Sequence, residues 1–259
     1  MIGVVGGTGL AALGEQPMHA TDSADTPFGQ ASEIPRRFAG LPNAVFLNRH
    51  GEGHTVLPHR INYRANLWLL NELGVEAIVA VFAVGGIARA LGDGDFVVPD
   101  QLVDYTWGRE HTFAGPGSSL LRGASLSRSP AEGSSHTDFS APFDAGLRQT
   151  LAESASRIGL KLCEGVYGCT QGPRFETAAE IDRMERDGCT VVGMTAMPEA
   201  ALARELGLPY AGVCLVVNPA AGRGVVSLEL ADMHKVVADA QPTMRRLLVE
   251  FLQLVEESG

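Results

Sequence analysis

The chain alternates short apolar runs with longer segments in which apolar residues recur every three or four positions. A short apolar run between turn residues predicts a buried strand, and the longer repeat predicts a helix with one apolar face. Strands that alternate with helices predict an α/β fold. We expect helices at 62–73, 147–158, 177–187 and 200–206 and from about Glu229 onward, with a bend near Pro242. We expect strands at 2–5, 36–38, 44–47, 77–83, 96–98, 102–105, 163–167, 190–194 and 210–217.

This alternation continues without a break, so we expect a single domain that spans residues 1–259. A hydrophobic content of 45% with 6% aromatic residues fits an aliphatic core that needs no metal or disulfide. The four cysteines lack C-x-x-C spacing and are expected to be reduced core thiols. The segment Val84-Gly85-Gly86 predicts a glycine turn after a buried strand, and the Gly/Ser/Pro-rich stretch 106–135 predicts a mobile flap.

The net charge of the chain argues against some classes of binding partner. A net charge of −10 and a pI near 5.1 argue against a surface that neutralises nucleic-acid phosphates or anionic lipid. No apolar run reaches membrane-spanning length, and the start of the chain does not resemble a signal peptide. We therefore expect a cytoplasmic protein without a nucleic-acid or membrane partner, in which a local positive field holds any anionic ligand.

A glycine-rich turn, Gly6-Gly7-Thr8-Gly9-Leu10, follows the first predicted strand. Its glycines let backbone N–H groups converge on an anion. The spacing does not match the dinucleotide-binding motif G-x-G-x-x-G, and the polar residues 14–35 stand where that motif needs a helix and a second strand. A phosphate cradle and a glycine turn without a ligand are both compatible with this segment alone.

Arg49 and His50 follow the strand expected at 44–47. The three histidines His50, His54 and His59 suggest a metal site, but the glycines and the proline between them disfavour a helical ligand pair. We expect no metal. A planar guanidinium fork beside an imidazole N–H instead suits phosphate oxygens, and an ordinary surface arginine is the alternative.

The segment 190–206 places a hydroxyl where a predicted strand meets a predicted helix. In parallel sheets this junction opens into a crevice, and free N–H groups at the start of the helix attract anions. Thr195 and Met194 are therefore candidate site residues. The alternative is that Thr195 only caps the helix.

Five motifs occur in order over nearly the whole chain: Gly6-Gly7-Thr8-Gly9-Leu10, Asn48-Arg49-His50-Gly51, His59-Arg60-Ile61-Asn62-Tyr63-Arg64-Ala65-Asn66, Gln171-Gly172-Pro173-Arg174-Phe175-Glu176-Thr177 and Gly193-Met194-Thr195-Ala196-Met197-Pro198-Glu199. Together they resemble the trimeric purine nucleoside phosphorylase and methylthioadenosine phosphorylase family. Within it, the turn Asn218-Pro219-Ala220-Ala221-Gly222 is most similar to the bacterial S-methyl-5'-thioinosine phosphorylases.

The resemblance implies the nucleoside phosphorylase fold, a single α/β domain around a twisted, partly barrel-like mixed sheet flanked by helices. It also implies a homotrimer with active sites at subunit contacts, and no cofactor, because phosphate is a co-substrate. Asn218 and His50 are the implied catalytic residues. Phe82 departs from the threonine that many relatives carry before the position of Ala83. The residues that match the family's phosphate-binding positions are Thr8, Arg49, His50, Ala83 and Thr195.

For the nucleoside, the resemblance implies that Phe175 packs on the purine, Glu176 and Asn218 bind the base, and Met194 lies under the ribose. His136 matches a residue donated by the neighbouring subunit near the 5' end of the sugar. Relatives that bind a 5'-hydroxyl carry a histidine early in the last helix. The best match here is Leu230, with His234 close by, and Leu230 favours a methylthio group.

The expected reaction is phosphate-dependent cleavage of the N-glycosidic bond of a 6-oxopurine nucleoside, with S-methyl-5'-thioinosine as the first choice of substrate. The amide of Asn218 can donate to O6, whereas relatives that cleave 6-aminopurines carry aspartates at the positions of Asn218 and Ala220. The alternatives are inosine or guanosine, or methylthioadenosine, as substrate. From other classes, a non-enzymatic nucleoside-binding protein stays open, and a nicotinamide-dependent dehydrogenase explains only the first glycine turn.

Overall fold

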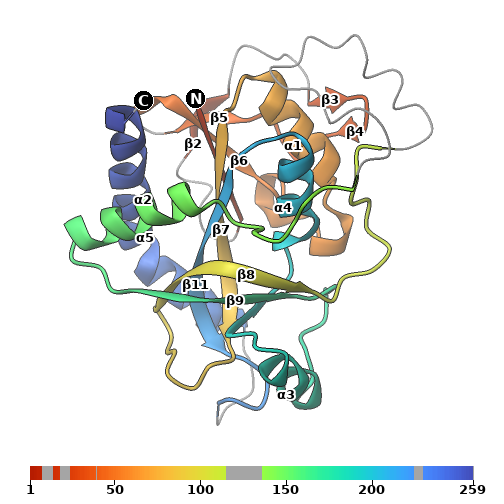
Figure 1. Ribbon diagram of the computed structural model, residues 1–259, viewed down its shortest axis with the longest axis vertical. Helices are drawn as coiled ribbons and strands as arrows, with labels where there is room; N and C mark the ends of the chain where they lie inside the picture. Colours follow the sequence, from red (N-terminus) through yellow and green to blue (C-terminus); the bar gives the residue numbers. More distant parts are fainter. Residues whose placement is uncertain (8–13, 18–23, 39, 115–135, 225–229, 259) are drawn as a thin grey trace.

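The computed structural model describes residues 1–7, 14–17, 24–38, 40–114, 136–224 and 230–258. Figure 1 shows the arrangement of its helices and strands. The α-helices are α1 (Tyr63–Glu72), α2 (Ala145–Arg157), α3 (Ala178–Arg186), α4 (Ala196–Glu205) and α5 (Leu230–Ser258). The strands are β1 (Ile2–Gly6), β2 (Gly14–Pro17), β3 (Asp25–Thr26), β4 (Gly29–Gln30), β5 (Arg36–Phe38), β6 (Leu41–Asn48), β7 (Ala77–Gly86), β8 (Phe96–Asp104), β9 (Leu162–Cys169), β10 (Val191–Gly193) and β11 (Tyr210–Pro219).

The large sheet is mixed and partly closed. Its strand order is β10-β9-β8-β11-β7-β1-β6-β5-β2, and β10 also pairs with β7, so that β7, β11, β8, β9 and β10 form a ring. The neighbours β6, β1, β7 and β11 run parallel, whereas β8 is antiparallel to β11 and β10 is antiparallel to β7. The expected twisted, partly barrel-like mixed sheet flanked by helices is confirmed.

Two pairs of helices flank the parallel part of the sheet. In Figure 1, α2 and α5 lie on one side, and α1 and α4 lie on the other. Strand β7 contributes side chains to the hydrophobic clusters on both faces of the sheet, because successive side chains of a strand point to opposite faces. Ile78 and Phe82 pack in the cluster that contains α1 and α4, and Val79 and Val81 pack in the cluster that contains α2 and α5. Burial on both faces explains why this strand is almost continuously apolar.

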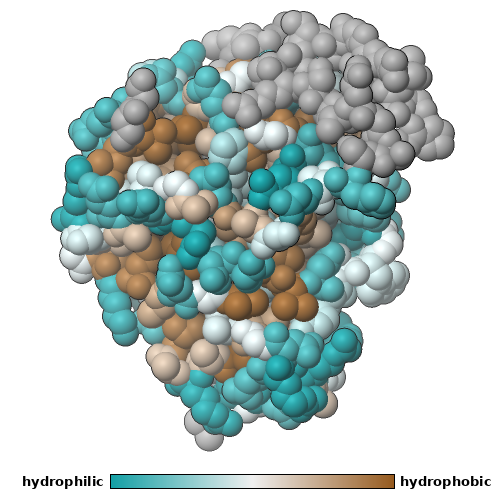
Figure 2. All heavy atoms as spheres, viewed as in Figure 1, coloured by the Kyte–Doolittle hydropathy of each residue, from teal (hydrophilic) through white to brown (hydrophobic). Residues whose placement is uncertain are grey.

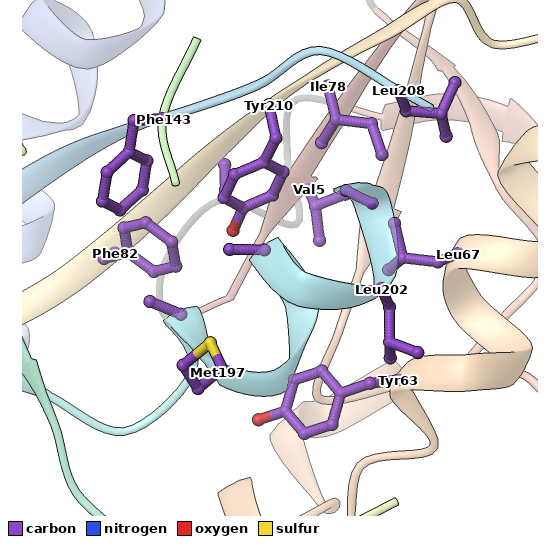
Figure 3. Packing of buried hydrophobic residues seen from close by; sticks show 14 of the residues in the cluster. Val5, Tyr63, Leu67, Ile78, Phe82, Phe143, Met197, Leu202, Leu208 and Tyr210 are labelled. Carbon is purple, nitrogen blue, oxygen red and sulfur yellow. The ribbon is translucent and has the colours of Figure 1, made fainter. Parts of the chain in front are cut away.

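Figure 3 shows the first of these clusters around α4, where the aromatic rings of Phe82, Tyr210 and Tyr63 lie beside the helix. The rings of Phe82 and Tyr167 meet edge to face, with their centroids 5.1 Å apart. The described cysteines Cys169 and Cys214 are buried here and carry free thiols. This packing fixes the start of α4 against the sheet.

The structure corrects several expected boundaries. Val84–Gly86 is not a turn but the end of β7, because its two glycines pair with β10 and close the ring. Residues 96–105, expected as two strands, contain the single strand β8, whose pairing with β9 is irregular between Pro99 and Gln101. Part of the polar segment 14–35 forms the short strands β2, β3 and β4.

Local signals in the sequence located the starts of α1 and α3, whereas α4 begins at Ala196, before the expected start at Ala200. The side chain of Asn62 accepts a hydrogen bond from the Ala65 N–H at the start of α1. Thr177 and Glu180 form a capping box at the start of α3. Within the described part of the chain, no helix has the length and apolar character needed to cross a membrane.

The first part of the expected flap is anchored to the core. Phe113 is buried, packs against the rings of Phe28 and Trp68, and donates its N–H to a carboxylate oxygen of Glu205. Residues 115–135 lie outside the described residues. On the surface, Figure 2 shows groups of hydrophobic residues between hydrophilic ones on one face of the molecule.

Candidate active site

A cavity of about 510 Å³ lies near the ends of the parallel strands β6, β7 and β11. Parallel strands bring their carboxyl ends to one edge of a sheet, and ligands bind there in α/β proteins. The cavity wall contains many of the residues that the sequence singled out, contributed by separate segments of the chain. These are Arg49, His50, Ala83, Phe175, Glu176, Met194, Thr195 and Asn218.

Arg49 lies inside the protein rather than on its surface. Its Nε and Nη2 donate to the two carboxylate oxygens of Glu199 at 3.0 and 2.8 Å, and both side chains are buried. Nη1 donates to the Val81 carbonyl at 2.8 Å, and Nη2 also donates to the Val5 carbonyl at 3.1 Å. The guanidinium fork expected to hold phosphate is therefore bound to Glu199. A guanidinium has five N–H groups, so these four bonds leave one N–H, on Nη1, for a ligand in the cavity.

The surroundings of this ion pair are fully buried. The Tyr210 hydroxyl donates to Glu199 at 2.8 Å, and the Arg49 guanidinium lies 5.1 Å from the centroid of the Phe82 ring. Burial alone lowers the pKa of Arg49, but the Glu199 carboxylate raises it above its ordinary value. Phe82 therefore makes a cation–π contact with Arg49.

His50 presents one ring nitrogen to the cavity. Its Nδ1 lies 2.8 Å from the Val56 carbonyl, which can only accept, so Nδ1 carries the proton and Nε2 is left for a ligand. Burial and the charge of Arg49 lower the pKa of His50 to about 3, so the ring is neutral near pH 7. Gly7 allows this packing, because a Cβ at that position would lie 2.8 Å from the His50 ring.

Thr195 lies at the junction between β10 and α4, as expected. It occupies the N-cap position of α4, but its side chain makes no capping hydrogen bond, and the residue lines the cavity. The geometry therefore does not support the alternative that Thr195 only caps the helix. Its neighbour Met194 lies against Gly172, whose φ is +60° and where a Cβ would be 2.5 Å from the Met194 sulfur. Glycine at 172 lets the following loop pass close over Met194.

Glu176 and Phe175 reach the cavity from the loop that follows β9. The Thr170 hydroxyl donates to Oε1 of Glu176 at 2.6 Å and thereby fixes the carboxylate. Phe175 is 42% exposed and offers an open aromatic face. Thr170 is a buried supporting residue that sequence reasoning missed, although it immediately precedes the motif at 171–177.

Asn218 lies near the end of β11, where pairing with β7 is irregular between Val216 and Asn218. Such a bulge redirects a side chain. The Asn218 amide donates to the Pro219 carbonyl at 2.6 Å, and the residue also lines the cavity. One N–H of the amide remains beyond this bond, so the side chain can still donate to a ligand.

One face of α5 forms the remaining wall. Leu230, Met233, His234 and Val237 line the cavity at the helical spacing i, i+3, i+4 and i+7. The His54 ring also lies in the wall, with its centroid 4.1 Å from that of His50. This part of the wall is therefore largely apolar, with two imidazoles at its margin.

Two expected site residues are not among the described residues that line this wall. Thr8 lies outside the described residues. His136 is exposed and does not line the cavity of its own chain, so its donation to a neighbouring subunit stays a prediction. Arg109 contacts the site backbone through several hydrogen bonds and was not singled out from the sequence, because no motif surrounds it.

The structure is an α/β fold whose cavity lies at the carboxyl ends of parallel strands, the usual place of ligand binding in such folds. The sequence matches the description "Phosphorylase superfamily" over residues 1–253, and the chain belongs to that family. The resemblance inferred from the motifs is confirmed.

Individual proteins of related sequence or structure show which members of the family this chain is similar to. The chain is 45% identical over 251 residues to a probable S-methyl-5'-thioinosine phosphorylase of Pseudomonas syringae pv. tomato, covering 96% of this chain and 97% of that one. It is 38% identical over 257 residues to a 6-oxopurine nucleoside phosphorylase of Pyrococcus furiosus, covering 98% and 92% of the two chains. A solved structure of methylthioadenosine phosphorylase from Schistosoma mansoni in complex with adenine superposes with a TM-score of 0.86 at 30% identity, covering 99% and 91%.

Proposed function

We propose that this protein is a phosphate-dependent phosphorylase of 6-oxopurine nucleosides that converts S-methyl-5'-thioinosine to hypoxanthine and 5-methylthioribose 1-phosphate in purine salvage. The observation that carries the proposal is a single cavity that joins His50 and Thr195 to Glu176 and Asn218. The relatives named for S-methyl-5'-thioinosine and for 6-oxopurine nucleosides support the same class of reaction.

In the proposed reaction, the bond between C1' and purine N9 breaks while a phosphate oxygen bonds to C1'. The transition state is oxocarbenium-like, so an anion beside C1' stabilises it. The proton that hydrogen phosphate gives up is balanced by the one that hypoxanthine gains. No covalent bond to the protein and no cofactor is needed.

The phosphate end combines three kinds of group. The remaining Nη1 N–H of Arg49 and the Thr195 hydroxyl can donate to phosphate oxygens. Nε2 of neutral His50 can accept from a protonated phosphate oxygen, since Nδ1 is committed to the Val56 carbonyl. Ala83, the exposed residue of otherwise buried β7, leaves room for the anion. Thr8 is proposed as a further phosphate ligand on the resemblance alone.

At the base end, the residues suit a 6-oxopurine. Such a base presents a donor at N1–H beside an acceptor at O6, whereas a 6-aminopurine presents an acceptor at N1 beside a donor. Oε2 of Glu176 can accept from N1–H, because only Oε1 is engaged by Thr170. The second amide N–H of Asn218 can donate to O6 or N7 as negative charge builds on the departing base. Phe175 can stack on the purine, and Met194 can lie under the ribose.

The sugar substituent is proposed to meet the apolar face of α5. Leu230, Met233 and Val237 offer aliphatic contacts to a methylthio group, and His234 is the residue of this face of α5 that carries a polar side chain. We further propose a cytoplasmic homotrimer in which His136 reaches the neighbouring subunit's sugar site. In mixed trimers, a His50→Ala subunit is then expected to lend its His136 to an intact neighbour. A fully active monomer in sedimentation and kinetic measurements contradicts the assembly.

A nucleoside panel tests the proposal. S-methyl-5'-thioinosine, inosine, guanosine and methylthioadenosine are compared in phosphate buffer, with free base and pentose 1-phosphate both quantified. We expect S-methyl-5'-thioinosine to exceed the others in kcat/KM. Methylthioadenosine is the second candidate, because the similar Schistosoma mansoni structure is a methylthioadenosine phosphorylase with adenine bound. Binding of hypoxanthine without turnover of any nucleoside points instead to a binding protein.

A further inference from the structure

Arg109 lies behind the cavity wall and bonds to two of the segments that form it. Its Nη2 donates to the Thr170 and Gln171 carbonyls at 3.1 and 2.8 Å, and its Nε donates to Oε1 of Gln171 at 3.0 Å. Its Nη1 donates to the Met194 and Met197 carbonyls at 2.8 and 2.5 Å. One guanidinium therefore joins the chain just after β9 to the chain just after β10.

These contacts use all five N–H groups of Arg109, and the residue is not part of the cavity wall. Within the described parts of the chain, no carboxylate lies within ion-pair distance of it. Its guanidinium lies 5.7 Å from the centroid of the Tyr63 ring. Arg109 is thus a fully bonded cation held by backbone carbonyls and an aromatic face. It has no donor left for substrate.

The backbone that Arg109 holds leads directly to residues of the site. Thr170 fixes the Glu176 carboxylate through its hydroxyl, and the Thr170 N–H donates to the Gly193 carbonyl at 2.8 Å. Met194 immediately precedes Thr195, whose side chain faces the cavity. A shift between these two segments changes the distance between the base-binding and phosphate-binding groups.

We propose that Arg109 is a positioning residue for phosphorolysis, which sets the separation of Glu176 and Thr195 by clamping the backbone behind each of them. This inference rests on the proposed function. Misplacement of reacting groups by about 1 Å can cost on the order of a hundredfold in rate. The conservative lysine variant offers three donors without the planar fork, so it can restore only part of the clamp.

Arg109→Ala and Arg109→Lys are compared with wild type in steady-state kinetics with both substrates varied, with and without low millimolar guanidinium chloride. We expect kcat/KM to fall about a hundredfold in Arg109→Ala and about tenfold in Arg109→Lys. We expect guanidinium to restore Arg109→Ala at least about fivefold in a saturable manner, which a loss of folded protein would not produce. Arg64→Ala is the matched control, because Arg64 stacks on Phe28 and pairs with Glu110 but does not contact the site backbone.

An Arg109→Ala loss of twofold or less overturns the proposal, and so does an equal loss in Arg64→Ala. If Arg109→Ala does not fold, Arg109→Lys provides the test. A stable Arg109→Lys protein with wild-type kinetics overturns the proposal that Arg109 positions the two backbone segments. The wild-type rates test the proposed function separately. If wild type releases no base, calorimetric affinity for hypoxanthine in the same variants replaces kcat/KM, with the same expected order.

Discussion

The two ends of the cavity are built in different ways. At the phosphate end, Arg49 is 1% exposed and its partner Glu199 is 0% exposed, and the two meet although 150 positions separate them in the sequence. At the nucleoside end, Phe175 is 42% exposed and Leu230 is 62% exposed. The proposed phosphate end is therefore anchored in the folded core by a buried ion pair, whereas the proposed nucleoside end includes surface-exposed side chains. Substitutions at the first should cost stability, and substitutions at the second should change substrate preference.

The largest expected effect tests this contrast directly. Glu199→Ala leaves Arg49 as an uncompensated buried charge and removes the acceptor of the Tyr210 hydroxyl, so we expect a loss of about 3 to 5 kcal/mol in the free energy of unfolding. Urea denaturation measures it. Glu153→Ala, which breaks the exposed pair with Arg157, is the control and is expected to change little. Equal effects of the two substitutions would remove the distinction between a core end and a surface end.

The second-largest expected effect is a change in the preference between 6-oxopurine and 6-aminopurine nucleosides. Asn218→Asp, especially with Ala220→Asp, replaces a donor to O6 with carboxylate acceptors, and we expect about 1 to 3 kcal/mol of discrimination to shift from S-methyl-5'-thioinosine toward methylthioadenosine. The measurement is the ratio of the two kcat/KM values in wild type and variants. An unchanged ratio would show that Asn218 does not read the 6-position of the base.

The buried histidine gives an effect on stability that depends on pH. Burial lowers the pKa of His50 to about 3, below the ordinary value of 6.5, so the unfolded chain takes up this proton first as pH falls. The resulting penalty is absent at pH 7 and grows between pH 6.5 and 3, by at most about 1.4 kcal/mol per pH unit. Urea titrations from pH 7 to 5 should show a loss of about 1 to 2 kcal/mol that His50→Gln lacks. Identical pH profiles for the two proteins would contradict the assignment.

The smallest expected effect concerns the exposed start of α5. Wild type should prefer S-methyl-5'-thioinosine over inosine by at least about tenfold in kcat/KM, or ~1.4 kcal/mol. Leu230→Asn should reduce this ratio severalfold with little change in thermal stability, because the side chain is largely exposed in the described chain. Inosine used as well as the methylthio substrate by wild type would reverse the proposed order of substrates.

The sequence predicted features that depend on neighbouring residues better than features that depend on contacts between distant segments of the chain. The starts of the helices expected at 62–73 and 177–187 depend on local signals, and Asn62 and Thr177 are indeed the N-cap residues of α1 and α3. The end of β7 was mistaken for a turn, because the glycines at 85 and 86 acquire their meaning only through pairing with β10. The motifs that follow the predicted strands indicated which segments meet at the cavity, because parallel strands bring their carboxyl ends to the same edge of a sheet.

Side-chain partners far apart in the chain were not predictable. Nothing near Arg49 indicates that Glu199 occupies its fork, and nothing near Arg109 indicates the carbonyls that surround it. Every residue has a backbone carbonyl, so the sequence does not indicate which carbonyls accept hydrogen bonds from an arginine. For this reason, the motifs identified residues that line the cavity better than residues that hold them in place.

Phosphate dependence tests the central claim most directly. Release of hypoxanthine from S-methyl-5'-thioinosine is followed with purified wild-type protein in phosphate buffer and in phosphate-free buffer of equal ionic strength. We predict turnover only with phosphate, and formation of one 5-methylthioribose 1-phosphate for each hypoxanthine. Equal release of hypoxanthine in both buffers, with free 5-methylthioribose as the other product, would contradict a phosphorylase.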